Sequence, residues 1–406
     1  MDFLRVSACF MVMLIHSTEP FYLGGDGGLI LSATDAFWVA LFEGASRCCV
    51  PLFLIASSYL QFPLHYSTGE FFRRRALRIL VPMAVWTLVY ALAWGQPVAN
   101  LKGLLLNFNY AAGHLWFVYM LVGIYLVMPL LSPWARTVSR RELEVYLGIW
   151  LLTTLFPFVR EAAGGVAPII QAADGLPAPA LFPLWGEASW NAFGMFYYLS
   201  GFIGYMLLGL YLRRFVRDSQ WTRFLGWALF LAGFVAIVSG LLRRFSATGD
   251  GFPIAGDLAI AVSWETPINF CGLPVVLTAV GLMLVFRQAS FREGRFYSSV
   301  ILPLSKAGYG MYLIHMLVLA RFSVLFRNLW GLGSGASLAD GVLGASGVLD
   351  TGGALSGGGV LDVGGAFGVW TTPVQILATA LSSFVVVGLV AILLQRIPKV
   401  GKYLMG

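Results

Sequence analysis

Long apolar segments alternate with short polar segments along almost the whole chain. A helix needs about 17–25 mostly apolar residues to cross a bilayer, and ten segments come close to that length. They cover residues 3–22, 36–61, 77–98, 114–133, 143–159, 193–212, 224–242, 268–286, 300–320 and 373–395. The pattern predicts an all-α, polytopic transmembrane helical bundle with about ten spans. A further apolar interval, 256–267, is short enough to be re-entrant.

The distribution of basic residues predicts the orientation of this bundle. With the N-terminus inside, 18 of the 26 Lys and Arg residues fall in cytoplasmic segments and six fall in external loops. Because cytoplasmic loops carry the excess of basic residues in membrane proteins, both termini are expected in the cytoplasm. The same loops account for the net charge of +7. No basic stretch interleaved with aromatic residues indicates nucleic-acid binding.

The remaining features of the composition suggest few further candidates for catalytic or metal-binding residues. The segment 331–368 is rich in Gly, Ala and Ser and contains a near-duplication with a period of twelve residues. It predicts a flexible external loop inserted into a single membrane domain, 1–406. The four cysteines lie in apolar runs without the spacing of metal ligands, so we expect small buried side chains. The first apolar run lacks a basic leader and a small-residue cleavage site, so no cleavable signal peptide is expected.

The first span carries two ionisable residues, Arg5 and His16. Such residues are costly to bury inside a membrane and mark a functional site by default. His16 follows Arg5 by eleven residues. At ~100° and ~1.5 Å per residue, the two share nearly the same helix face and lie ~16 Å apart. This stripe predicts a site for a long anionic molecule, with a proton-transfer group at its far end.

Three other arginines stand close to predicted membrane segments. Arg75 and Arg78 are three residues apart, so we expect them to share a helix face. With Arg5 they would form a basic pocket for phosphates, which guanidinium groups bind well. For the neighbouring Arg73 and Arg74, the alternative is that they only set the orientation of the protein in the membrane. Arg47 lies inside a span one turn after Glu43, and a structural ion pair between them is an equal alternative to a role in binding.

The histidines and aromatic residues leave two interpretations open. Neutral histidine is a good general base near pH 7, and His16 is the favoured candidate. His315 is expected at a similar depth, either in the site or as a hydrogen-bonded structural residue. His114 and Trp116 begin a span on the external side. There the aromatic residues are typical both of an interfacial belt and of a surface for a sugar ring.

Five motifs, taken in their order along the chain, resemble those of the membrane-bound acyltransferase-3 family. The first is Arg5, ten residues, then His16. The others are Ser46–Tyr59, Arg75-Ala-Leu-Arg78, His114-Leu-Trp-Phe117 and Gly308–His315. Ser58 stands where the family usually has glycine, a departure that concerns packing more than chemistry. Each motif alone is weak, but five in the correct order are specific. The resemblance covers nearly the whole chain except the Gly-rich segment.

The resemblance implies transfer of an acyl group, usually acetyl, from cytoplasmic acyl-CoA to a hydroxyl of an extracytoplasmic or lipid-linked glycan. By position, it implies that His16 is catalytic and that the donor is held by Arg5, Arg75 and Arg78. An acceptor-binding or supporting role then falls to Arg47, His114, Trp116, Tyr309, Tyr312 and His315. It also implies a multi-pass protein of the bacterial inner membrane. Acetyl-CoA is the expected donor substrate, with no permanently bound cofactor and no metal.

The acceptor and the chemical route are left open at this stage. The stretches around Arg47 and His114 are most similar to enzymes that acetylate bacterial surface polysaccharides. Exopolysaccharides are equally open, including cellulose made by a synthase complex whose operon encodes a family member. His16 would either deprotonate the acceptor hydroxyl or carry the acyl group itself.

Two other functions compete with acyl transfer. A transporter or flippase would favour inverted repeats, and the sequence shows no clear internal repeat. A structural subunit of a polysaccharide synthase leaves Arg5 and His16 unexplained.

Overall fold

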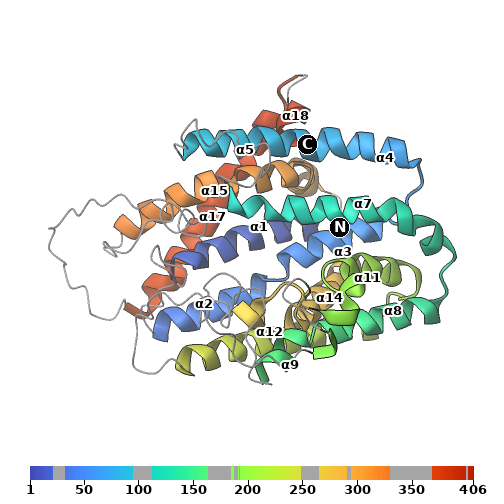
Figure 1. Cartoon of the computed structure of the whole chain (residues 1–406). Helices are drawn as coiled ribbons and strands as arrows, with labels where there is room; N and C mark the ends of the chain where they lie inside the picture. The colour runs from blue at the N-terminus through green and yellow to red at the C-terminus, as the bar shows by residue number, and fades with distance from the viewer. Residues whose placement is uncertain are drawn as a thin grey trace.

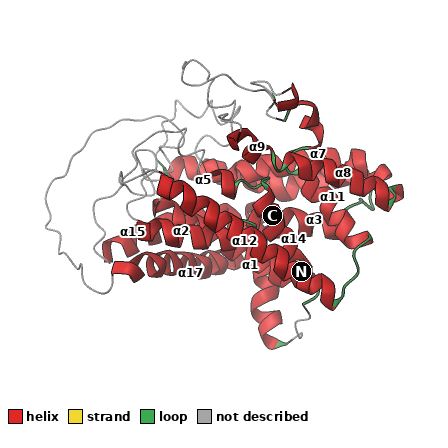
Figure 2. Ribbon diagram, turned by 90° about the horizontal axis from the view of Figure 1, so that it is seen from below, coloured by secondary structure: helices red, strands yellow, loops and turns green. Residues whose placement is uncertain are grey.

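The computed structural model describes residues 1–21, 33–94, 112–162, 184–186, 191, 193–247, 265–289, 294–329, 368–398 and 401–406. In these residues the chain folds into helices and contains no strand (Figures 1 and 2). The predicted all-α bundle is therefore confirmed. Of the predicted Gly-rich segment 331–368, residues 331–367 lie outside the described residues. Of the predicted re-entrant interval 256–267, residues 256–264 lie outside them as well.

Eight helical segments of the described chain are long and apolar enough to cross a membrane. They are Ala33–Gln61, Thr68–Ala93, Gly113–Thr137, Arg140–Ala162, Gln220–Phe245, Thr266–Arg287, Tyr297–Phe326 and Thr371–Gln395. Each overlaps one of the predicted spans. The other two predictions, 3–22 and 193–212, overlap the shorter helices α1 (Asp2–Thr18) and α11 (Ile203–Arg214), which have 17 and 12 residues.

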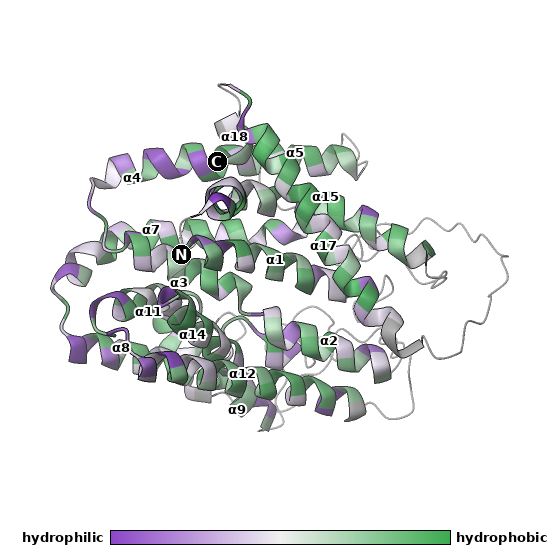
Figure 3. Ribbon diagram, turned by 180° about the vertical axis from the view of Figure 1, so that it is seen from behind, coloured by the Kyte–Doolittle hydropathy of each residue, from purple (hydrophilic) through white to green (hydrophobic). Residues whose placement is uncertain are grey.

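The outer surface of the bundle is apolar, as a bilayer requires. Large apolar side chains recur every three or four residues along α17 (Gly368–Gln395), which places them on one face. They are Val374, Leu377, Leu381, Val385, Leu389 and Leu393, which are 43–61% exposed. Figure 3 shows hydrophobic residues along this helix and along α15 (Leu302–Leu329), whereas α4 (Thr68–Arg75) is mostly hydrophilic. An exposed stripe of this size fits contact with lipid.

Helix α1 lies in the centre of the bundle. It packs against α2 (Ala33–Ser46), α3 (Cys49–Gln61), α15 and α17, and Figure 1 shows it between α17 and α3. Its apolar residues, such as Leu4 and Met13, are buried in these contacts. The charged stripe of the first span is therefore held inside the protein and not at the lipid surface.

Two predicted spans are interrupted in the structure. The span 36–61 consists of α2 and α3, which are separated at Arg47 and Cys48. The span 143–159 consists of α8 (Arg140–Thr153) and α9 (Phe156–Ala162). A break in a membrane helix frees backbone groups that need other partners. The break at Arg47 also gives its side chain a route to another segment, since Nε donates to the carbonyl of Ile268 at 2.8 Å.

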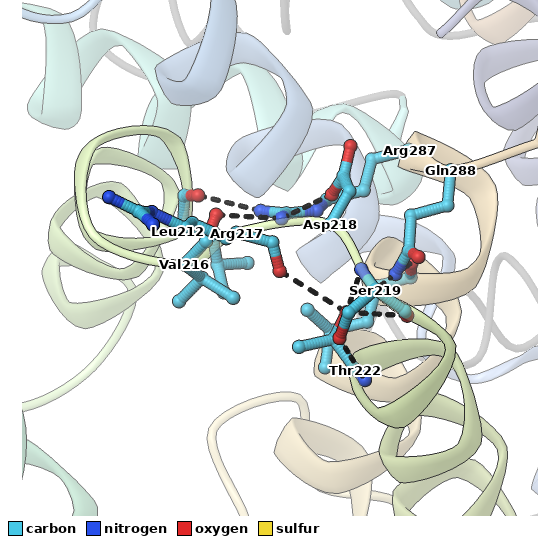
Figure 4. A network of polar contacts seen from close by, with 9 residues as sticks. Leu212, Val216, Arg217, Asp218, Ser219, Thr222, Arg287 and Gln288 are labelled. Carbon is cyan, nitrogen blue, oxygen red and sulfur yellow. Dashed lines mark hydrogen bonds and ion pairs between the residues drawn. The ribbon is translucent and has the colours of Figure 1, made fainter.

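Arginine side chains tie together the segments predicted to be cytoplasmic. Arg136 donates to the carbonyl of Leu64, and Arg214 donates to that of Ala135. Arg287 donates to two carbonyls at the end of α11 and pairs with Asp218 (Figure 4). Cations are favourable at helix C-termini, where carbonyl groups are left unpaired. These contacts place the predicted inner segments at one end of the bundle.

Both chain ends belong to that same end. Asp2 accepts hydrogen bonds from Ser305 and Tyr297, at 2.6 and 2.8 Å. Gly406 lies against the backbone of Arg78 and the ring of Tyr309. This arrangement agrees with the predicted topology, in which both termini share one side of the membrane.

Candidate active site

A cavity of about 300 Å³ lies among α1, α3, α7 (Trp116–Thr137) and α15. From α1 and the turn after it, the lining residues are Arg5, Val12, Ile15, His16 and Glu19. The other helices and the segments beside them contribute Arg47, Val50, Phe53, Ser57, His114, Trp116, Phe117, Leu121, Tyr125, Ser305, Lys306, Tyr309 and Tyr312. The eleven-residue spacing of Arg5 and His16 therefore brings both into one cavity, as the sequence predicts.

The lining changes in character along the cavity. Arg5 and Lys306 provide positive charge at the end near the chain termini. Apolar side chains such as Phe53 and Leu121 form the middle. His16 and Glu19 lie at the opposite end, eleven and fourteen residues after Arg5. This order suits a ligand that has an anionic end, a long neutral arm and a reactive group at the tip.

His16 is held by a carboxylate that the sequence reasoning did not single out. Its Nδ1 atom lies 2.7 Å from Oε1 of Glu19, and the two side chains are 17% and 21% exposed. A carboxylate only accepts hydrogen bonds, so Nδ1 carries the hydrogen, and in the neutral form of the ring Nε2 keeps its lone pair. The sequence does contain a signal for this contact, because Glu19 follows His16 by three residues and side chains at that spacing are neighbours on a helix.

Two more imidazoles pack behind His16. The ring centroid of His315 lies 5.1 Å from that of His16, and the ring of His114 lies 5.1 Å from that of His315. His315 is fully buried and does not line the cavity, and its Nδ1 donates to the carbonyl of Tyr312. Within the described residues, its Nε2 and both ring nitrogens of His114 have no hydrogen-bond partner. Among these residues no group of His, Cys, Asp or Glu is arranged to hold a metal ion.

Arg47 forms the ion pair that the sequence suggests, and it also lines the cavity, so a role in binding stays a prediction. Glu43 is fully buried and accepts from the Thr18 hydroxyl at 2.8 Å and from Arg47 Nη1 at 3.4 Å. The Arg47 guanidinium also lies 4.3 Å from the ring centroid of Phe270. These contacts fix a positive charge on the cavity wall.

The aromatic residues of the predicted set form the walls of the cavity. Trp116 packs on Phe270 with centroids 5.4 Å apart. The hydroxyl of Tyr309 donates to the carbonyl of Ile79 at 2.8 Å, and that of Tyr312 donates to the carbonyl of His114. Because both tyrosine hydroxyls are engaged by backbone, these residues hold α15 against its neighbours.

A second cavity of about 760 Å³ lies at the end of the bundle near the chain termini, and we call it the basic mouth. Its lining residues are Arg73, Arg74, Leu77, Arg78, Lys306, Gln395, Tyr403 and Gly406. Lys306 lines both cavities. Arg74 pairs with Glu70, but Arg5, Arg78 and Lys306 form no ion pair with any described residue. Asp2 acts electrostatically on Arg5 without forming an ion pair with it. Positive charge therefore predominates at this end, as expected at a site for an anion.

Arg75 and Arg78, predicted to share a face, have different surroundings. Arg75 lines neither cavity; its guanidinium donates to Gln61 and lies 4.8 Å from the ring centroid of Tyr125. The reason is a π-helical turn at Ala76–Leu80. Its i→i+5 hydrogen bonds give a wider turn, so residues three apart no longer align as they do on an α-helix. Arg75 thus supports the cavity wall through Tyr125, while Arg78 reaches the basic mouth.

The comparison with protein families gives one match. The family model described as an acyltransferase domain, that of the acyltransferase-3 family, matches residues 1–394. The matched region includes the whole lining of the main cavity and most of the basic mouth. No match was found among the curated proteins or among the solved structures.

Proposed function

The chain belongs to the acyltransferase-3 family of membrane acyltransferases, and on that premise we propose that it transfers an acyl group, in the first place acetyl, from acyl-CoA to a glycan hydroxyl. The acceptor would be a surface polysaccharide, an exopolysaccharide such as cellulose, or a lipid-linked glycan. One observation carries the proposal: a single cavity has unpaired cations at one end and the His16–Glu19 pair at the other.

The charge distribution supports an acyl-CoA donor. The phosphate groups of coenzyme A are anionic, and guanidinium and ammonium groups bind phosphate through charge-assisted hydrogen bonds. Arg78 and Lys306 line the basic mouth, and Arg5 lines the cavity beyond it. From Arg5 to His16 the helix rises ~16 Å, a length comparable to that of an extended pantetheine arm. A donor held by its phosphates at this end would present its thioester near His16.

The His16–Glu19 pair supplies the chemistry of a direct transfer. Nε2 of His16 takes the proton of the acceptor hydroxyl as the oxygen attacks the thioester carbon. The C–S bond then breaks, and the leaving thiolate takes the proton back from the imidazolium. Glu19 stabilises that imidazolium through Nδ1, and the Arg47 charge favours the anionic tetrahedral intermediate. A covalent route, in which Nε2 first accepts the acyl group, uses the same atoms.

The opposite end of the cavity suits a sugar acceptor. Trp116 and Phe270 present aromatic surface beside the polar groups of Arg47 and His16. Aromatic faces pack well against the apolar faces of sugar rings, and the polar groups would orient the hydroxyl. With the basic mouth on the cytoplasmic side of a bacterial inner membrane, the donor would enter from the cytoplasm. The acceptor would then meet it from the other side, as a complex with a polysaccharide synthase would allow.

Purified protein in lipid nanodiscs tests this proposal. Labelled acetyl-CoA is supplied with candidate oligosaccharides, and the free CoA thiol and the acetylated product are both measured. Wild-type protein should release CoA and form product, whereas His16→Gln should lose at least ~10²-fold in rate. His65→Gln is the matched control, because His65 is exposed and lines neither cavity. Equal rates for wild type and His16→Gln would contradict the proposal.

A further inference from the structure

Lys306 stands at the junction of the two cavities. It follows Ser305 near the start of α15 and lines both the basic mouth and the main cavity. Asp2 is the nearby acid, but both of its carboxylate oxygens accept hydrogen bonds from hydroxyls, those of Ser305 and Tyr297. The ammonium group of Lys306 forms no ion pair with any described residue. A positive charge is therefore left available where a ligand passes from one cavity into the other.

The unpaired cations form a series from the mouth inward. Arg73 and Arg78 line the basic mouth only, Lys306 lines both cavities, and Arg5 lines the main cavity only. Coenzyme A carries its negative charge at two separate places, the 3′-phosphate on the ribose and the diphosphate that precedes the pantetheine arm. Two places of negative charge along one molecule correspond to an outer and an inner part of this series.

We propose that Lys306 and Arg5 bind the diphosphate of the acyl-CoA donor at this junction, while Arg73 and Arg78 receive the 3′-phosphate. This inference rests on the proposed function and assigns each part of the donor to a part of the site. It adds Lys306 to the donor-binding residues and places Arg75 outside the donor contacts, as a residue that supports Tyr125.

The depth of the junction supports this division. Along α15, Lys306 precedes His315 by nine residues, which is a rise of ~13 Å, and the ring of His315 lies 5.1 Å from that of His16. Along α1, Arg5 precedes His16 by ~16 Å. A diphosphate at the junction would therefore lie one pantetheine length from His16 on both helices. If the outer arginines held the diphosphate instead, Lys306 and Arg5 would form no ion pair with the donor, and Arg5 would keep only its interaction at a distance with Asp2.

The competing account is that Lys306 is only a topogenic charge at the inner end of a span. Such a lysine needs to lie on the correct side of the membrane, but it does not need to face a cavity. Lys306 lines two cavities, and its neighbour Ser305 is fixed by Asp2. A topogenic lysine and a phosphate-binding lysine also differ in one measurable way: only the second discriminates among donors by their phosphates.

A series of shortened donors tests the assignment. The donors are acetyl-CoA, acetyl-3′-dephospho-CoA, acetyl-phosphopantetheine and acetyl-pantetheine, and kcat/KM is measured for each with wild type, Lys306→Gln and Arg78→Gln. Wild type should prefer acetyl-phosphopantetheine to acetyl-pantetheine. Lys306→Gln should reduce that preference by roughly ten- to a hundredfold, the range for one charged hydrogen bond. Its preference for acetyl-CoA over the dephospho donor should remain, and Arg78→Gln should show the reverse pattern.

Two further variants complete the test. Lys306→Arg should keep the preference because it keeps the charge, and Arg295→Gln, an exposed residue that lines neither cavity, should match wild type. If Lys306→Gln lowers kcat/KM for all four donors by the same factor, or for none of them, the assignment is overturned. If wild type uses no acetyl thioester at all, the proposed function fails.

Discussion

His16 Nδ1 lies 2.7 Å from Glu19 Oε1, just past the end of α1. In the proposed mechanism this pair joins a base to the group that orients it, a relationship that recurs in acid–base and nucleophilic catalysis. Because both residues line the cavity that also contains Arg5, one short segment of chain supplies the charged and the reactive parts of the site.

Glu19→Gln tests the orienting role of this carboxylate. The amide removes the negative charge that stabilises the imidazolium and can hold the ring in the other tautomer by donating to Nδ1. We expect kcat to fall by on the order of 10²-fold, with little change in the KM for the donor. Steady-state kinetics with acetyl-CoA measure both values. Glu144→Gln, an exposed residue paired with Arg140, is the control; a Glu19→Gln enzyme as fast as this control would show that the pair has no catalytic role.

Arg78→Gln and Arg75→Gln should have different effects, although the two residues belong to one motif. Arg78 lines the basic mouth, so its loss should raise the KM for acetyl-CoA roughly tenfold or more while leaving kcat nearly unchanged. Arg75 supports Tyr125 and Gln61, so its loss should lower the temperature of unfolding and change KM less. Kinetics and thermal unfolding are measured for both variants. Matching increases in KM would contradict the different positions of the two side chains.

Arg75 and Arg78 also show which features of the site could be predicted from the sequence and which could not. The regular hydrophobic pattern predicts the spans, and the eleven-residue spacing places Arg5 and His16 in one cavity. The face shared by Arg75 and Arg78 was predicted from α-helical geometry, and a π-helical turn changes it. The residue types of Ala76–Leu80 do not by themselves mark this turn, but Pro82 follows it, and a proline cannot donate to the carbonyl of Arg78 as a regular α-helix requires. The sequence analysis did not use that signal.

Arg47 and Glu43 give a prediction about stability and activity together. Arg47→Met leaves the fully buried Glu43 without its ion pair, and breaking such a pair typically costs about 3–5 kcal/mol. The double variant Glu43→Gln/Arg47→Met removes both charges and should recover most of the lost stability. Activity should not recover, because the positive charge on the cavity wall is still missing. Thermal unfolding and acetyl transfer are measured for both variants; recovery of activity together with stability would mean that Arg47 is purely structural.

The contact between α12 (Gln220–Ala247) and α14 (Leu273–Arg287) depends on glycine. A Cβ atom on Gly281 would lie 2.5 Å from the carbonyl oxygen of Gly226 and 2.5 Å from the nitrogen of Phe230. Small residues allow this close approach of membrane helices. Gly281→Ala should therefore destabilise the protein by about 1–3 kcal/mol.

The control for this substitution is Gly148→Ala in α8, where a Cβ atom has nothing within 4 Å. Alanine there should leave the midpoint of thermal unfolding unchanged or raise it, since alanine is the better helix former by about 0.5–1 kcal/mol. A Gly281→Ala protein that unfolds at the same temperature as Gly148→Ala would contradict the close packing of α12 and α14.

Glu19 and Lys306 were not predicted as site residues, for a physical reason. Acidic and basic residues near span ends are common, and their usual roles are solvation and topology. Only the packing of α15 beside α1 shows that Lys306 faces two cavities. The contact of Glu19 with the ring of His16 is local, between residues three apart, so the sequence did carry a signal for it. The spacing of one helix was readable from the sequence, whereas contacts between helices far apart in the chain were not.

The most direct test measures the acyl groups on surface glycans of a bacterial strain that lacks this protein. The strain is complemented with wild type, His16→Gln or His65→Gln, membrane levels of all three proteins are matched, and base-labile acyl groups are quantified by mass spectrometry. Wild type and His65→Gln should restore acylation, and His16→Gln should not. Restoration by His16→Gln to the level of wild type would contradict the central claim that acyl transfer takes place at His16.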